Sequence, residues 1–597
     1  MFARCKNAPV ELLALAAVVL AALLAPAWFP SEGVLAQEPQ AKPADHVSGV
    51  VINSVTREPI ARALVISEGE LFATMTDSSG RFEIVFPEAA PGGQTPTTLS
   101  RPVAPENFRR IAPRPHMLTA RKPGFLNSQS QQGQLGEQVV DGKEVEIALV
   151  PEALIVGHIS LPTSEPPDPI EVELYQRQVR SGRAHWVSVG IRSTRSDGEF
   201  RFAELSAGSY RLLTHERRDD DPKFAAPEGQ AYGYPPVYYP NASGFSSAGS
   251  IALTPGKLAH ANLKLVRQPY FPVIVPVTNL PPGNRFGLDV SVQGTGGPGY
   301  ELGYDRQKQS IVGLLPNGSY QLRVMSFGTE AFSGEANLTV HGGTEGTLLP
   351  LAATPAIRVN VKDQFTSEPD PVMTGTVGPH GKVIPQQRRF DVTLTLEAVD
   401  DFRTQQQNAS TAGSLDPQTN SMQIEHVAPG RYWVEVYPTD GYVASVTSGG
   451  VDLRHRPLVV PSGSSAPSIE VLLRNDQATV EGVVEGASSL TGSAAPIAVG
   501  PNGWNGPSSS DSSARLYFIP LPDSAGRFTE RPVAHDGRFS VSLPPGDYRV
   551  LVFPQVQPDL EYENPEAMRA YDTKGQVVRL AAGQKEQLQL QLLSASE

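Results

Sequence analysis

Cysteine is almost absent from this chain of 597 residues. The only one, Cys5, precedes the first apolar run of the sequence. A lipoprotein anchor needs its cysteine just after such a run, so Cys5 does not fit a lipidation site. Once the first residues are removed, no cysteine is left. The remaining chain can therefore use no disulfide, no thiolate metal ligand and no cysteine nucleophile.

Apolar runs long enough to cross a membrane are missing as well. The run at 12–25 has 14 residues, fewer than the roughly 20 that a transmembrane helix requires. It follows Arg4 and Lys6 and precedes small residues that end at Ala36, a pattern typical of a secretory signal peptide. We expect a signal peptide over 1–36 and a linker over 37–46. The mature chain is then exported to the periplasm or the medium, with no membrane span.

An excess of basic residues is also lacking. The chain carries 49 Lys and Arg against 62 Asp and Glu, a formal net charge of −13. Nucleic acids and anionic membrane surfaces attract basic stripes, and none is present here. The charge balance therefore argues against a nucleic-acid partner and against binding to an acidic lipid surface.

Motifs of common catalysis are absent. None of the eleven histidines begins a His-x-x-Glu pair of the zinc carboxypeptidase kind, and no His-Glu-x-x-His, Gly-x-Ser-x-Gly or phosphate-binding glycine loop occurs. No Asp-x-Asp-x-Asp-Gly loop for Ca²⁺ occurs either. We predict that the protein is not an enzyme and has no catalytic residue, metal site or cofactor. Isolated histidines such as His158, His185 and His426 are interpreted as strand residues.

A repeated Gly-x-Tyr step followed by an alternating apolar strand is what the sequence does contain. Its tyrosines, spaced 110, 112 and 116 residues apart, are Tyr210, Tyr320, Tyr432 and Tyr548. A degenerate first copy is centred on His116. Three copies of an Asp-x-x-Gly or Asp-Gly turn ahead of alternating apolar residues, as at Gly198-Glu-Phe200, add hairpin signals. A repeat of this length indicates tandem domains, each the size of a β-sandwich.

The predicted fold class is therefore all-β, with about five immunoglobulin-like β-sandwiches in a string. Very short linkers predict a semi-rigid rod or a bent string. Short helices are expected near 106–111 and after Asn564, and a loop is expected over 486–513. The module boundaries implied by the repeat are 47–151, 152–268, 269–352 (degenerate), 353–476 and 477–597 (with the short helix).

The recurring tyrosines suit a structural role. A sandwich needs a tight turn where the chain crosses between its sheets, and a Tyr there can bury its ring and return its hydroxyl to the backbone, as in a tyrosine corner. The alternative, that these tyrosines contact a ligand, is weaker because their regular place before an alternating strand is typical of core residues.

Residues 47–86 and 116–125 resemble the carboxypeptidase regulatory-like domain. The likeness lies in a Gly-x-Val opening, a Pro-Ile-x-x-Ala-x-Val segment, Thr-x-Thr-Asp-x-x-Gly-x-Phe and a closing Lys-Pro-Gly-Phe. It is full in the first module, moderate in the second and fifth, and poor in the others. The resemblance implies a seven-stranded transthyretin-like (prealbumin-like) sandwich, grouped with carbohydrate-binding-like folds. It implies no peptidase activity, because the zinc ligands are missing.

Two features are candidates for binding. The first is an aromatic loop in the second module, whose flat rings suit sugars or protein partners and equally suit covering the sandwich edge. It contains Phe224, Tyr232, Tyr234, Tyr238, Tyr239 and Phe245, and the binding candidates are Tyr232, Tyr234, Tyr238 and Tyr239. The second is the acidic run 219–221, a weak Ca²⁺ candidate that is more typical of a solvated turn.

These observations leave three functions open. The first is a non-catalytic exported scaffold or interaction protein that binds an envelope or extracellular protein. The second is a carbohydrate-binding protein that uses the aromatic loop of the second module to hold a polysaccharide. The third is a regulatory subunit of a separate hydrolase.

Overall fold

The computed structural model describes most of the chain from residue 45 to residue 593. The described residues are 45–67, 72–86, 116–126, 137–139, 144–162, 169–219, 229–242, 244–281, 283–292, 300–328, 330–343, 346–368, 372–377, 383–388, 390–399, 409–411, 415–416, 418–463, 466–487, 514–534 and 536–593. Outside this set lie the expected signal peptide, most of the expected linker, the helix expected near 106–111, most of the loop expected at 486–513, and Asp220, Asp221 and Phe224.

Strands dominate the described residues, which confirms the all-β prediction of tandem sandwiches. The one α-helix described is α2 (Pro565–Met568), followed by the 3-10 turn η5 (Arg569–Tyr571). Asn564 caps α2 by accepting hydrogen bonds from the backbone of Glu566 and Ala567, and Pro565 occupies the first turn. No described helix has the length and apolar character needed to cross a bilayer.

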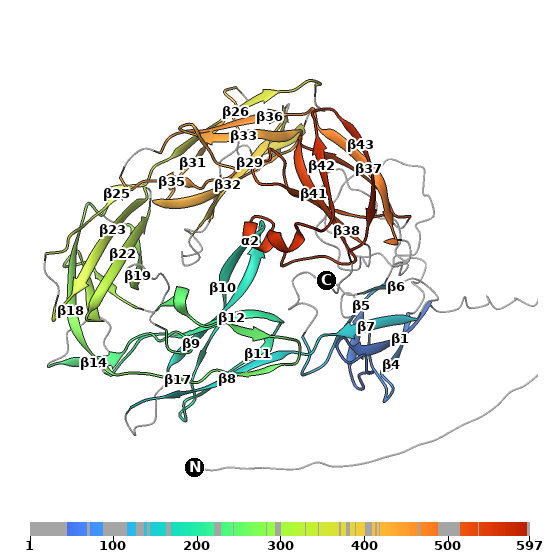
Figure 1. The fold of residues 1–597 in the computed structure, drawn as a ribbon. Helices are drawn as coiled ribbons and strands as arrows, with labels where there is room; N and C mark the ends of the chain where they lie inside the picture. Colours follow the sequence, from blue (N-terminus) through green and yellow to red (C-terminus); the bar gives the residue numbers. More distant parts are fainter. Residues whose placement is uncertain are drawn as a thin grey trace, which may run out of the picture.

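The first sandwich shows the plan that the others repeat (Figure 1). One sheet has the order β4-β1-β7 and the other β3-β2-β5-β6. The opening strand lies in the middle of its sheet, antiparallel to β4 and parallel to the closing strand β7. The strands are β1 (Asp45–Asn53), β2 (Leu64–Ser67), β3 (Ala73–Met75), β4 (Arg81–Phe86), β5 (His116–Arg121), β6 (Glu137–Val139) and β7 (Val145–Leu149).

The second sandwich repeats this order with β11-β8-β16 facing β10-β9-β12-β15, and β17 also pairs with β8. Its strands are β8 (Ala153–Ser160), β9 (Glu171–Arg180), β10 (Arg183–Ser193), β11 (Glu199–Leu205), β12 (Gly208–Thr214), β15 (Ile251–Leu253), β16 (Leu258–His260) and β17 (Leu263–Lys264). The 3-10 turn η2 (Phe245–Ser247) precedes β15.

The third sandwich departs from the plan in the strands at the edges of its sheets. Strands β13 and β14 extend its first sheet to β13-β14-β18-β21-β20, with β24 also on β18, and the second sheet is β19-β22-β23-β25. The strands are β13 (Arg217–Arg218), β14 (Ala231–Tyr234), β18 (Gln268–Thr278), β19 (Arg285–Val292), β20 (Gly303–Asp305), β21 (Ser310–Pro316), β22 (Gly318–Phe327), β23 (Phe332–Val340), β24 (Leu349–Pro350) and β25 (Ala352–Ala353). A hairpin, β20–β21, is present here without an Asp-Gly turn.

The fourth and fifth sandwiches return to the plan. The fourth has β31-β26-β36-β33-β34 against β30-β29-β32-β35, with the hairpin β27-β28 beside them. Its strands are β26 (Ile357–Gln364), β27 (Val372–Val377), β28 (Val383–Arg388), β29 (Val392–Ala398), β30 (Ala409–Thr411), β31 (Ser421–Ile424), β32 (Gly430–Pro438), β33 (Tyr442–Ser448), β34 (Val451–Asp452), β35 (Leu458–Val460) and β36 (Ile469–Arg474). The fifth has β40-β37-β43 against β39-β38-β41-β42. Its strands are β37 (Ala478–Glu485), β38 (Arg515–Pro520), β39 (Thr529–Pro532), β40 (Arg538–Leu543), β41 (Gly546–Phe553), β42 (Gln576–Leu580) and β43 (Lys585–Gln591).

A glycine–phenylalanine pair explains part of the sequence signature. In the first, second and fifth sandwiches, a glycine in the opening strand lies opposite the Phe that follows the Asp-x-x-Gly or Asp-Gly turn, as Gly49 lies opposite Phe82. A Cβ on Gly49 would lie 2.6 Å from that ring and 2.2 Å from the carbonyl oxygen of Val145. The ring therefore occupies the space that only glycine leaves free, and the third and fourth sandwiches lack both members of the pair.

Five main hydrophobic cores follow one another along the part of the chain that the structure describes. Their buried residues fall within 47–149, 153–265, 273–351, 357–473 and 478–590. Figure 1 shows the sandwiches placed around an arc, with the hairpin β9–β10 projecting from the second sandwich toward α2 of the fifth. The string is therefore bent far enough to bring distant modules together.

Candidate functional site

The hairpin β9–β10 is built to reach beyond its own sandwich. Its strands have 10 and 11 residues, which at about 3.3 Å per residue makes an arm roughly 30 Å long. Ser181 and Gly182 form its two-residue turn, and both have positive φ values, 47° and 73°. This turn type matches the right-handed twist of a hairpin and favours glycine. The tip therefore forms a compact end that can enter a gap between other modules.

The tip docks on the segment before α2 in the fifth sandwich. The carbonyl of Gly182 accepts a hydrogen bond from the backbone N–H of Glu563 at 3.1 Å. A Cβ on Gly182 would lie 2.6 Å from the ring of Tyr562. That ring cannot easily retreat, because it stacks on Phe528 with ring centroids 3.7 Å apart. Glycine is thus required here both for the turn and for close contact with Tyr562.

Arg183 ties the hairpin to two modules at once. Its guanidinium lies 3.9 Å above the ring of Trp433 and 3.5 Å from the carboxylate of Glu435, both on β32 of the fourth sandwich. It also donates a hydrogen bond to Glu563 of the fifth sandwich at 3.2 Å. With only 16% of its side chain exposed, Arg183 makes contacts that are screened less than surface ion pairs. A second pair, Arg177 with Glu561, lies 2.5 Å apart beside it.

Arg527 links the fourth and fifth sandwiches at the same place. Its guanidinium donates to the carbonyl of Val436 at 3.1 Å and lies 4.7 Å above the ring of Tyr437. Burial raises the pKa of the nearby Glu435, and the charges of Arg183 and Arg527 oppose that rise. Three modules therefore meet here. Arg183 of the second sandwich and Arg527 of the fifth lie around the half-buried carboxylate of Glu435 in the fourth.

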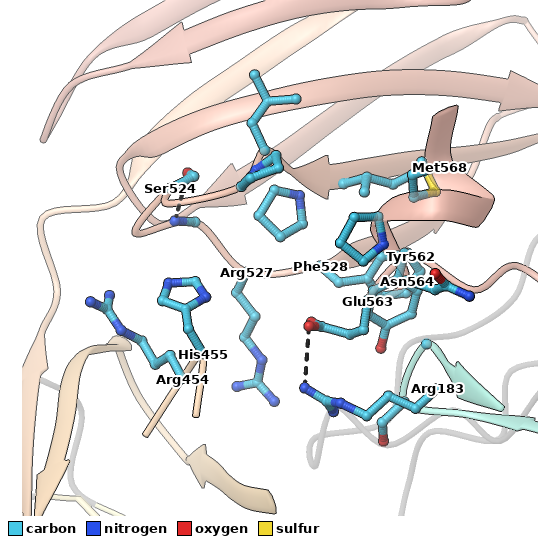
Figure 2. Close-up of a pocket in the computed structure, with 18 of the residues that line it drawn as sticks. Arg183, Arg454, His455, Ser524, Arg527, Phe528, Tyr562, Glu563, Asn564 and Met568 are labelled. Atoms are coloured by element: carbon cyan, nitrogen blue, oxygen red, sulfur yellow. Dashed lines mark hydrogen bonds and ion pairs between the residues drawn. The ribbon is translucent and has the colours of Figure 1, made fainter. Parts of the chain in front are cut away.

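A cavity of about 1050 Å³ lies at this junction. Its lining comes from the hairpin tip of the second sandwich, from β32 and the 453–455 segment of the fourth, and from the 519–528 and 561–572 segments of the fifth. In Figure 2 the side chain of Arg527 extends into the space between His455 and Arg454 on one side and Glu563 and Arg183 on the other. We call this set of contacts and the cavity the junction.

The four signature tyrosines are buried, with exposed fractions of 0–2%. Each hydroxyl donates to the backbone carbonyl four residues earlier, at 2.7–2.8 Å; the acceptors are Ser206, Pro316, Ala428 and Pro544. Each Gly-x-Tyr step opens the strand that follows the crossing from one sheet to the other. Three of its glycines, Gly208, Gly430 and Gly546, have φ of 149–154°, a region that residues with side chains rarely adopt.

The aromatic loop does not form one exposed platform. Tyr234 and Tyr238 are buried at 3% and 4% exposure, and Tyr239 packs half-buried against the second core. Tyr238 instead joins Tyr175 and Phe245 in a small cluster outside that core. Tyr232 alone of the four is exposed, at 38%, and the guanidinium of Arg267 lies 4.4 Å above its ring. Arg267 in turn pairs with Asp219, the one described member of the acidic run.

A second buried carboxyl group lies where the second and third sandwiches join. Glu216 accepts a hydrogen bond from the backbone N–H of Glu301 at 2.9 Å. Burial raises the pKa of Glu216 to about 7, although the Glu301 N–H bond and the charge of Arg218 oppose the rise. The joint between these sandwiches therefore contains a carboxyl group that changes charge near neutral pH.

The cluster of Ser188, Glu173 and His215 does not have the order of a catalytic triad. Ser188 donates to one oxygen of Glu173 at 2.6 Å, and His215 lies 2.8 Å from the other. Burial alone would raise the pKa of Glu173, but these two bonds outweigh it and lower that pKa. Because the carboxylate lies between Ser188 and His215, the serine has no imidazole to activate it. Within the described ranges, no three His, Asp or Glu side chains gather as metal ligands.

Sequence reasoning missed the junction. Arg183, Trp433 and Tyr562 belong to three separate modules. The sequence predicts the helix after Asn564 but not its contact with the hairpin. No spacing in the chain relates residues 183, 433 and 562, because their contact depends on the angles between modules.

No protein-family model and no curated protein sequence matches the chain. Among solved structures, it is similar to BcpA, the major pilin subunit of Bacillus cereus, with 10% identity, 54% of this chain and 99% of that chain covered, and a TM-score of 0.14. It is also similar to GBS52, the minor pilin of Streptococcus agalactiae, with 12% identity, 37% of this chain and 95% of that chain covered, and a TM-score of 0.18. A third similar structure is that of two B repeat units of the collagen-binding protein of Staphylococcus aureus. The identity is 7%, the match covers 74% of this chain and 99% of that chain, and the TM-score is 0.13. Likenesses this weak carry no weight for what this chain binds.

Proposed function

We propose that this chain is an exported, non-catalytic interaction protein whose five β-sandwich modules are held as one frame by the hairpin β9–β10. The modules are assigned to 47–151, 152–268, 269–352, 353–476 and 477–597, and the resemblance of the first to carboxypeptidase regulatory-like domains is part of the proposal. The signal peptide over 1–36 supports export. The partner is an envelope or extracellular protein.

The observation that carries this proposal is the docking of the hairpin tip on two other modules. A string of sandwiches with free joints would present each module separately to a partner. Here Gly182 and Arg183 fix the second sandwich against the fourth and fifth, so that surfaces from distant parts of the sequence face one another. Preorganisation of this kind lowers the entropy lost when a partner binds.

Carbohydrate binding through the aromatic loop is favoured less by the geometry. Sugar rings stack on open aromatic faces, and burial removes Tyr234 and Tyr238 from any such surface. Tyr232 remains exposed and stays the one candidate of the four for a sugar contact. No described contact favours the third function, a regulatory subunit of a hydrolase.

The proposal is tested by capture of partners from an envelope extract. The open-frame variant carries Gly182→Ala and Arg183→Ala, and its matched control carries Gly583→Ala and Arg579→Ala. Gly583 also has a positive φ, 68°, but a Cβ there meets nothing within 4 Å, and the side chain of Arg579 is 83% exposed.

We expect the wild type and the control to retain the same partner, identified by mass spectrometry, and the open-frame variant to lose it. Retention of that partner by all three proteins would show that the frame is not needed for binding. Failure of the wild type to retain any protein would contradict the proposed function itself.

A further inference from the structure

Among the arginines that line the junction, all of them described, Arg527 alone has no carboxylate within 4 Å, although its charge still acts on Glu435. Arg177 pairs with Glu561, Arg183 with Glu435 and Glu563, and Arg454 with Asp452. Arg527 donates instead to a neutral carbonyl and lies on the ring of Tyr437, with no described carboxylate within 4 Å.

A ligand in the cavity would remove water from the guanidinium of Arg527. An anionic group on the ligand would replace that water with charge-assisted hydrogen bonds. A carboxylate is such a group, and the planar guanidinium can bind it through two parallel hydrogen bonds. His455 and Arg454 lie on the same side of the space that Arg527 enters (Figure 2), which places a second guanidinium on that side.

The apolar part of the lining favours a chain with aliphatic or proline side chains over a sugar. Trp433 is covered by Arg183, and Phe528 and Tyr562 stack on each other. These three rings are thus already stacked on groups of the protein itself. What remains on the lining includes Met568 and three proline rings, Pro520, Pro522 and Pro565.

The size of the cavity lies at the upper end of the range for small-molecule pockets and leaves room for a short peptide. Pockets for small ligands have volumes of about 300–1,000 Å³, and this cavity has about 1050 Å³. Its walls come from three modules, so an extended ligand would contact all three.

From these observations we infer that the junction binds an extended acidic peptide segment of a partner protein, with one of its carboxylates on Arg527. This inference rests on the proposed function as an interaction protein and names the partner's chemistry. Binding would add contacts that exist only while the hairpin is docked, so the peptide would also stabilise the closed frame.

The experiment measures binding of a fluorescein-labelled hexapeptide of alternating Glu and Pro by fluorescence polarisation. The same peptide with Gln in place of Glu is the charge control, and a galacturonate tetrasaccharide tests the sugar alternative. The protein variants are Arg527→Gln, Arg454→Gln on the facing wall, and Arg579→Gln as a matched loss of one exposed charge from the fifth sandwich.

We expect the Glu-Pro peptide to bind the wild type and Arg579→Gln equally, and Arg527→Gln about tenfold or more weakly. Arg454→Gln should weaken binding by a smaller factor, and the Gln-Pro peptide should bind neither protein. Small-angle X-ray scattering of each variant shows whether the frame is still closed, since Arg527 also joins two modules.

Three results would overturn the inference: no binding of the Glu-Pro peptide, equal binding by Arg527→Gln with a closed frame, or binding of the tetrasaccharide in place of the peptide. If Arg527→Gln opens the frame, the comparison of Arg454→Gln with Arg579→Gln decides, and equal binding by these two would also overturn it. The proposed function would survive each result if the wild type still retains a partner that the open-frame variant loses.

Discussion

The hairpins β9–β10 and β38–β39 occupy the same place in two sandwiches but differ in length and in the modules that they contact. Each is the edge hairpin of the four-stranded sheet, next to the strand that begins with Gly-x-Tyr. Strands β38 and β39 have 6 and 4 residues, and their hairpin meets the fourth sandwich through Arg527 in its loop, whereas β9 and β10 have 10 and 11 and their tip reaches both the fourth and the fifth. Lengthening one edge hairpin has therefore turned a repeated element into a contact between modules that are not neighbours in the sequence.

Burial along these hairpins shows the same contrast. Residues of β38 alternate little and are mostly buried, because both faces of that strand are covered by the core and by the cluster around α2. No residue of β10 is buried, but Arg183 and His185 near the tip are half-buried against the fifth and fourth sandwiches, and Trp186 packs on Phe245 of its own sandwich. This edge strand is thus held by its pairing with β9 and by the contacts at its tip.

Breaking the tip contact should have the largest effect. In the open-frame variant (Gly182→Ala with Arg183→Ala), the new Cβ meets the ring of Tyr562 and the ion pairs to Glu435 and Glu563 are lost. We expect the radius of gyration from small-angle X-ray scattering to increase, while circular dichroism shows unchanged strand content. The control Gly583→Ala with Arg579→Ala should scatter like the wild type. An unchanged radius in the open-frame variant would contradict the docking of the hairpin.

A change of pH should loosen the other joint, between the second and third sandwiches. The folded pKa of Glu216, about 7, lies above its unfolded value of 4.5, so its contribution to stability is full below pH 4.5 and is lost as the pH rises through 7. The loss amounts to about 3 kcal/mol for 2.5 pKa units. We expect protection of β14 and β18 from hydrogen exchange, corrected for intrinsic rates, to fall between pH 5 and pH 8.

In Glu216→Gln that fall should disappear, because the neutral amide cannot ionise. Protection in this variant that falls with pH as in the wild type would assign the effect to other groups. Those that face Glu216 are Arg218, Tyr270, Tyr300, Tyr320 and Glu301.

Removal of one corner hydroxyl should have the smallest effect. Tyr432→Phe deletes the hydrogen bond to the carbonyl of Ala428, 2.7 Å long and buried, and leaves the ring in place. We expect a loss of about 1 kcal/mol in the fourth sandwich, measured by urea titration with the fluorescence of Trp433 in a chain whose other tryptophans, Trp28, Trp186 and Trp504, are replaced by Phe. Tyr232→Phe, at an exposed ring, should change stability by only a few tenths of a kcal/mol. Equal effects of the two substitutions would mean that the corner bond contributes nothing.

The fold was accessible from the sequence because its signals are local. Gly-x-Tyr marks each crossing between sheets because the turn needs glycine and the corner needs a buried hydroxyl, and both act within five residues. Gly49 and Phe82, which pair across two strands, likewise lie within one module. Where such local signals were eroded, in the third and fourth sandwiches, the repeat spacing still located the strands around Tyr320 and Tyr432.

The junction was not accessible in this way. Arg183 contacts Trp433 and Glu563, which are 250 and 380 residues away, and no alternation or spacing links them. The aromatic loop looked like a surface because its rings stand among glycines and prolines, yet Tyr238 packs with Tyr175 and Phe245 below that loop. Local pattern specifies each sandwich, whereas the contacts between sandwiches depend on how far one hairpin extends.

The most direct measurement is the distance between the hairpin tip and α2 in solution. Cys5, within the predicted signal peptide, is the only cysteine, so in a chain that carries Cys5→Ser, Arg180→Cys and Glu566→Cys, both at exposed positions, can carry two spin labels without interference. Pulsed electron–electron double resonance should give one short, narrow distance distribution, which becomes long and broad in the open-frame variant. A broad distribution in the otherwise wild-type chain would contradict the closed frame.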